Sequence, residues 1–217
     1  MNKHLLLKQT RDYVKEKMGH ESTGHDWFHI ERVVKMAKQI AKKETGTDIF
    51  VIELAALLHD IGDWKIRDFN KSEDEVLEDV TKLLTFPTDI KEKVIEIVLN
   101  MSYSKNLDGR TKLSLEGEIV QDADRLEALG AIGIARAFAY GGKKNREMYN
   151  PLVKPKNFKS TDSYRTANGT TINHFYEKLF LLKDLMNTET AKKVASKREK
   201  FMKKFLDEFY KEWNGEK

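Results

Sequence analysis

The sequence predicts an all-α protein that folds as one domain. Two stretches, residues 33–41 and 90–101, repeat apolar residues at intervals of three and four, which places those residues on one face of a helix. Similar stripes recur over residues 175–186 and 201–213, and we expect them to pack into the core. The alternation of apolar and polar residues that marks half-buried strands is nearly absent, so no sheet is predicted.

Capping and turn signals divide the chain further. Ser72 followed by Glu75 has the spacing of a capping box and predicts the start of a helix. The glycines at 141 and 142 predict the end of a helix that runs through residues 131–140. Residues 143–171 hold two of the three prolines and no helical stripe, so we expect a long loop there. Residues 1–217 are thus predicted to form a single helical domain, with a core at about residues 20–142, the loop at 143–171 and two C-terminal helices at 172–213.

Composition excludes several classes of protein. The chain has 39 Lys and Arg against 35 Asp and Glu, and a formal charge of +4 is small for 217 residues. We therefore expect neither specific nucleic-acid binding nor a polybasic membrane anchor. The absence of cysteine fits a cytoplasmic location and leaves only His, Asp and Glu as metal ligands. Residues 5–7, three leucines, are too short an apolar run for a signal peptide or a membrane span.

The predicted loop is strongly basic. Residues 143–165 carry seven Lys and Arg against two acidic residues, a local balance of +5. Two interpretations stay open: a lid over an anionic ligand, with Lys154 and Lys156 as its contacts, or an ordinary solvated surface loop.

Polar residues interrupt otherwise apolar helices at three places. His25 and His29 lie four apart, His59 and Asp60 follow the apolar residues 54–58, and two aspartates follow within residues 122–124. Burying such groups without partners costs several kcal/mol. A divalent cation, which imidazole and carboxylate bind at about 2.0–2.2 Å, would satisfy all of them together. Taken singly, each group has an ordinary explanation, as a core histidine or as an aspartate paired with Arg125 or Arg136.

The order and flanks of these residues resemble the HD-domain phosphohydrolase superfamily. The matching segments are "HDWFHIERV", "LLHDIGD" and "DADRL", and "GAIGIARAFAYGG" is similar to a small bacterial branch of that superfamily. The resemblance implies a nucleotide phosphohydrolase that cleaves a phosphoanhydride or phosphate ester, with pyrophosphate release from a nucleoside triphosphate as the leading reaction. It also implies that the metal is held by four residues, His29, His59, Asp60 and Asp124.

Asp122 competes with Asp124 for the fourth ligand position. Asp122 shares a helical stripe with Leu115, Ile119 and Leu126, whereas "ADRL" around Asp124 matches the setting in the family. We prefer Asp124.

A single divalent ion is expected. In binuclear relatives of the HD family the extra ligands are largely histidines between the His-Asp doublet and the final aspartate, and residues 61–123 contain no histidine. Mn²⁺ is favoured, although Co, Mg, Zn, Fe and Ni are not distinguishable.

Other residues near the motifs are candidates for catalysis or substrate binding. Asp63 lies one turn beyond His59 and could transfer protons, or could simply be solvated at a helix end. Arg32 and Arg125 follow predicted ligands, and each could contact a metal-bound phosphate or instead clamp a carboxylate. His25 is expected to contact phosphate or to support the ligands, and Lys65 is a weaker substrate-binding candidate.

Two other functions stay open. "HDWFH" has the histidine spacing of the zinc-peptidase signature H-E-x-x-H, but Asp26 would have to replace its glutamate and His59 would then have no role. Alternatively, the protein could be a non-catalytic helical module that binds a nucleotide and keeps the metal only for structure.

Overall fold

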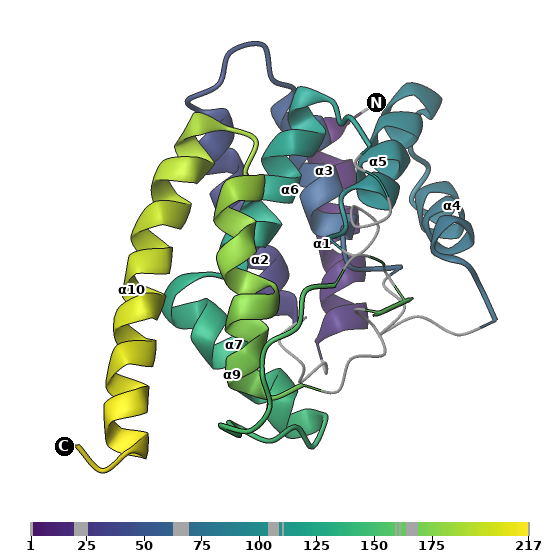
Figure 1. The fold of residues 1–217 in the computed structure, drawn as a ribbon. Helices are drawn as coiled ribbons and strands as arrows, with labels where there is room; N and C mark the ends of the chain where they lie inside the picture. Colours follow the sequence, from purple (N-terminus) through teal and green to yellow (C-terminus); the bar gives the residue numbers. More distant parts are fainter. Residues whose placement is uncertain are drawn as a thin grey trace.

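The computed structural model describes residues 2–19, 26–62, 70–103, 109, 111–158, 160, 162–163 and 169–216. These residues form helices and no strands, which confirms the all-α prediction (Figure 1). The helices are α1 (Lys3–Met18), α2 (Trp27–Ala41), α3 (Ile49–Leu58), α4 (Glu73–Leu83), α5 (Thr88–Asn100), α6 (Leu115–Glu127), α7 (Gly130–Lys143), α9 (Thr171–Glu177), the 3₁₀ helix η2 (Leu179–Leu185) and α10 (Glu189–Trp213). Within the described ranges, no helix is both long and apolar enough to cross a membrane.

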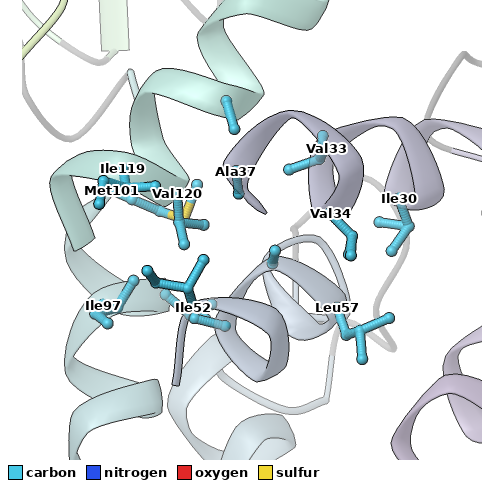
Figure 2. Close-up of a cluster of buried hydrophobic side chains, with 14 of the residues drawn as sticks. Ile30, Val33, Val34, Ala37, Ile52, Leu57, Ile97, Met101, Ile119 and Val120 are labelled. Carbon is cyan, nitrogen blue, oxygen red and sulfur yellow. The ribbon is translucent and has the colours of Figure 1, made fainter. Parts of the chain in front are cut away.

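Helix α3 lies at the centre of the core. Every residue from Phe50 to Leu58 is buried, which fits a helix that is apolar on all sides, and α3 packs against α1, α2, α5 and α6. Figure 2 shows Ile52 of α3 among Ile97 of α5 and Ile119 of α6. Each such side chain stabilises the fold by about 1.5–3 kcal/mol relative to exposure. The C-terminal end of α3 is thereby held inside the protein, where its next two residues are His59 and Asp60.

The C-terminal part of the chain packs on the outside of this core. Helix α10 lies along one edge of the molecule and contacts α6, α7 and η2 (Figure 1). Its predicted stripe is only partly buried, because Met202 and Leu206 are in the core while Phe201 and Trp213 are about half exposed. The apolar residues of the predicted stripe over residues 175–186 are buried as expected, although the backbone leaves the helical path at Lys178 and resumes as η2.

The helix-end predictions had mixed outcomes. The capping box is present: the Ser72 amide donates to Glu75 and the Glu75 amide donates to the Ser72 hydroxyl. The predicted helix end at Gly141 was wrong, because α7 continues to Lys143. A Cβ at Gly141 would clash with the Thr171 hydroxyl oxygen, so this glycine allows α7 to pack closely against the start of α9.

Backbone and side-chain hydrogen bonds attach the basic segment, residues 143–165 of the predicted loop, to α9. The Thr171 amide donates to the carbonyl of Glu147 (2.9 Å), the Asn173 side chain donates to the carbonyl of Val153 (3.0 Å), and the Lys156 amide donates to Glu177 (3.0 Å). The Lys154 and Lys156 side chains are exposed. Two further basic residues of the predicted loop, at 159 and 165, lie outside the described residues.

Candidate metal centre

Three helices bring the predicted ligands together. His29 lies in the first turn of α2, where its amide donates to the N-cap Asp26 (2.7 Å). His59 and Asp60 follow the end of α3, and Asp124 lies on α6. Because α2 packs against both α3 and α6, the residues that are far apart in sequence meet at one point.

The donor atoms of these residues form a compact cluster. The Nε2 atoms of His29 and His59 are 3.2 Å apart. Asp60 Oδ2 lies 3.4 Å from each of them. Asp124 Oδ1 lies 3.5 Å from His29 Nε2 and 3.7 Å from His59 Nε2. His29, His59 and Asp60 are buried, whereas the Asp124 side chain is 35% exposed, so the cluster opens toward solvent on the Asp124 side.

These residues fit a bound metal ion. Ligand atoms at about 2.1 Å from one ion are about 3.0–3.4 Å from one another in octahedral or tetrahedral geometry, close to the separations observed. His59 Nδ1 lies 2.9 Å from the Ala56 carbonyl oxygen and must donate to it, since a carbonyl can only accept. The His59 Nε2 lone pair is therefore directed at the other ligand atoms, as metal binding requires.

Charges within the cluster shift its titration. Burial alone would lower the pKa of His59, but the carboxylates of Asp60 and Asp124 outweigh it and raise the pKa to about 9. Burial acts to raise the pKa of Asp124, and the nearby His59 and His29 lower it below its usual value. Without a metal, the cluster is therefore a buried ion pair with a proton on His59 at neutral pH.

Metal binding should therefore compete with protonation of His59. The proton favours the metal-free fold below pH 6.5, and that contribution is lost as the pH rises through about 9. We expect the apparent Mn²⁺ affinity to rise by about tenfold per pH unit between pH 6.5 and 8.5. Chelator competition across this range measures it, and an affinity independent of pH would contradict the assignment of His59 Nε2 as a ligand.

The structure separates the two competing aspartates. Asp122 is fully buried and accepts hydrogen bonds from the backbone amides and side chains of Asn187 and Thr188, each 2.8–2.9 Å long. Thr188 is the N-cap of α10, so Asp122 fastens the start of α10 to α6. Of the two aspartates, Asp124 is the one that lies beside the histidines.

The two candidate arginines contact protein groups. Arg32 Nε donates to Glu127 Oε2 at 2.6 Å, which is the carboxylate clamp among its two predicted roles. Arg125 is buried and donates to the carbonyl of Leu185 at the end of η2. Asp63, His25 and Lys65 lie outside the described residues.

Sequence reasoning missed Glu127. Glu127 is buried, and its Oε2 lies 3.6 Å from His29 Nδ1 as well as beside Arg32. Burial acts to raise the pKa of Glu127, but the His29 ring and the Arg32 guanidinium hold it below its usual value. The available signal was spacing, because Glu127 follows Asp124 by three residues and so shares its face of α6.

Arg136 of α7 is a second residue with an unexpected position. Its positive charge contributes to the lowered pKa of Asp124, after the larger effects of burial and the two histidines. The sequence suggested Arg136 only as an ordinary ion-pair partner. Its side chain is half-buried, within electrostatic range of Asp124.

An all-α core that gathers two histidines and two aspartates in the order His, His-Asp, Asp defines a protein of the HD-domain class. The HD domain family model matches residues 27–129. The uncharacterized protein YpgQ of Bacillus subtilis is 36% identical over 209 residues, which cover 96% of this chain and 94% of YpgQ. The chain therefore belongs to the HD-domain family, and the predicted resemblance is confirmed.

Solved structures agree with this assignment. A crystal structure from Lactobacillus plantarum has a TM-score of 0.87 at 40% identity and covers 96% of this chain and 97% of its own. YpgQ in complex with ADP has a TM-score of 0.75 at 35% identity, with 98% and 97% covered. An HD-superfamily hydrolase from Bacillus thuringiensis has a TM-score of 0.74 at 41% identity, with 98% and 99% covered.

Proposed function

We propose that this protein is a metal-dependent phosphohydrolase that acts on nucleotides, cleaving a phosphoanhydride of a nucleoside triphosphate to release pyrophosphate. The observation that carries this proposal is the cluster itself. Its four donor atoms come from three helices, and each measured pair is 3.2–3.7 Å apart. The cluster opens toward solvent on the side of Asp124. A single divalent ion per chain, with Mn²⁺ favoured, would be held by His29, His59, Asp60 and Asp124.

Particular residues of the chain would hold the metal, attract the substrate and transfer protons. When bound, such an ion supplies an acidified water and stabilises negative charge on a phosphoryl oxygen. His29 and His59 would present Nε2 to the ion, while the carboxylates of buried Asp60 and partly exposed Asp124 would balance its positive charge. Arg136, whose positive charge already acts on Asp124, is placed to attract the phosphates of a substrate. Asp63 remains the predicted acid–base group.

Two observations favour a nucleotide over other phosphorylated substrates. The B. subtilis relative YpgQ has been crystallised with ADP, and the sequence similarity to it extends over nearly the whole chain. The described part of the basic segment carries two exposed lysines, Lys154 and Lys156, whose positive charges would attract a polyanionic substrate. The zinc-peptidase alternative loses support, because His29 is directed at His59 and Asp60.

A nucleotide panel tests this proposal. Purified protein with Mn²⁺ is incubated with nucleoside mono-, di- and triphosphates, and phosphate is resolved from pyrophosphate among the products. The account expects pyrophosphate from at least one triphosphate, and no product from the Asp124→Ala variant. Tight nucleotide binding without any turnover would contradict it and favour the non-catalytic module.

Charge reversal in the basic segment should affect triphosphates most. We expect the double variant Lys154→Glu, Lys156→Glu to raise KM for a triphosphate by about 3–10-fold and KM for a monophosphate by less. The effect is modest because exposed charges interact weakly, and it is larger for the triphosphate because that substrate carries more negative charge. Reversal of two exposed lysines on α10, Lys193 and Lys197, is the matched control. Equal effects on both substrates, or the same effect from the control, would remove the segment from substrate binding.

A further inference from the structure

Helix α6 contacts both nitrogens of one imidazole. Asp124 Oδ1 lies 3.5 Å from His29 Nε2, and Glu127 Oε2 lies 3.6 Å from His29 Nδ1 on the other side of the ring. The two carboxylates are three residues apart on α6, so one helical turn spans the width of the ring. The ring itself is fully buried. Its orientation is therefore set by α6 as much as by its own helix α2.

The two histidines of the cluster are supported differently. His59 Nδ1 faces a neutral backbone carbonyl, that of Ala56, at 2.9 Å. His29 Nδ1 faces a carboxylate, which favours a proton on Nδ1 and leaves the Nε2 lone pair free to bind a metal. At 3.6 Å the contact is slightly longer than a hydrogen bond, and a small ring rotation would close it.

Arg32 completes this arrangement from α2. It follows His29 by one turn, and its Nε donates to the same Glu127 oxygen that faces His29 Nδ1, at 2.6 Å. The Arg32 side chain is 34% exposed, whereas that of Glu127 is 4% exposed. An isolated carboxylate at this depth would be costly, so Arg32 provides the countercharge that keeps Glu127 ionised beside the ring.

We propose that Glu127 is a positioning residue that fixes His29 with its proton on Nδ1 and its Nε2 toward the metal, and that Arg32 acts through Glu127 rather than on the substrate. This inference rests on the proposed role of His29 as a metal ligand. Of the two predicted roles of Arg32, it selects the carboxylate clamp over a contact with the phosphate of the substrate.

Metal affinity tests the role of Glu127 without relying on turnover. Mn²⁺ is titrated into the full-length protein, and free Mn²⁺ is measured by electron paramagnetic resonance. Glu127→Ala should weaken Mn²⁺ binding by about 10–100-fold, and Glu127→Asp should recover part of the loss. The control is Glu199→Gln on α10, which also removes a buried carboxylate paired with cations, Lys183 and Lys203, and should leave Mn²⁺ affinity within about twofold.

Three outcomes would be decisive against parts of this account. Absence of Mn²⁺ binding by the wild-type protein would overturn the proposed function and this inference with it. Normal wild-type binding, with unchanged affinity in a folded Glu127→Ala, or in Glu127→Gln if the alanine variant does not fold, would overturn this inference alone. An equal loss of affinity in Glu199→Gln would show a general effect of removing buried charge and would also overturn it.

Arg32 is tested by separating metal binding from substrate binding. Arg32→Gln should weaken Mn²⁺ affinity, and at saturating Mn²⁺ its KM for the triphosphate should stay within about threefold of wild type. A KM raised by about tenfold or more at saturating Mn²⁺ would place Arg32 on the substrate and overturn its assignment.

Discussion

Replacing Asp124 with alanine should remove the metal and leave the fold intact, whereas replacing Asp122 should do the opposite. Asp124 is partly exposed and faces the histidine nitrogens, so its loss should lower metal affinity and hydrolysis by more than about 100-fold. Asp122 holds Asn187 and Thr188 through four hydrogen bonds in the core, so Asp122→Ala should destabilise the protein by about 3 kcal/mol or more.

Elemental analysis and denaturant unfolding measure the two effects separately. Asp122→Asn keeps the shape of the side chain, and its smaller loss of stability provides a folded protein if the alanine variant does not fold. We expect this asparagine variant to retain the metal. Stoichiometric metal in Asp124→Ala together with metal loss in a folded Asp122→Asn would reverse the assignment of the fourth ligand.

Chelation should abolish hydrolysis, and His59→Ala should reduce it by more than about 100-fold even with excess Mn²⁺. His59 is buried, and its removal leaves Asp60 and Asp124 without the neighbour that lies 3.4 and 3.7 Å from their oxygens. Activity that returns on adding Mn²⁺ or Co²⁺ to the chelated wild type is the expected control. The measurement is product formation before and after exhaustive chelation.

The same experiment separates the remaining alternatives. A peptidase based on the "HDWFH" segment would keep peptide hydrolysis in His59→Ala, because its ligands would be His25 and His29. Full nucleotide turnover after chelation, with metal absent by elemental analysis, would contradict metal dependence altogether.

The sequence predicted the fold class because helical periodicity reports directly on which residues are buried. The stripes in α2 and α5 lie in the core as their spacing indicated. The errors occurred where tertiary contacts override local signals. Gly141 has the appearance of a helix stop, yet α7 passes through it, and the missing side chain instead leaves room for Thr171 of α9.

The sequence predicted which residues form the cluster, and it indicated much less about the residues that support them. Any helical packing that joins α2, α3 and α6 brings His29, His59, Asp60 and Asp124 close together. The choice between neighbours depends on rotation about a helix axis, which sequence spacing leaves uncertain by a residue or two. Glu127 was missed because its only signal in the sequence is its spacing of three residues from Asp124, and its contact with Arg32 depends on the packing of α2 against α6.

The direction of the arginines could not be predicted for a related reason. A guanidinium group on a long side chain reaches several possible partners from one backbone position. Arg32 and Arg125 both follow predicted ligands in sequence, but Arg32 donates to Glu127 and Arg125 donates to the carbonyl of Leu185. Only the packed neighbours decide between these partners.

Anomalous diffraction at the manganese edge, from crystals grown with Mn²⁺, tests the central claim most directly. The account predicts one anomalous peak per chain, at about 2.0–2.3 Å from His29 Nε2, His59 Nε2, Asp60 and Asp124. A peak absent from this cluster, or located at another group of residues, would contradict the metal centre, and two strong peaks would contradict the single-ion count.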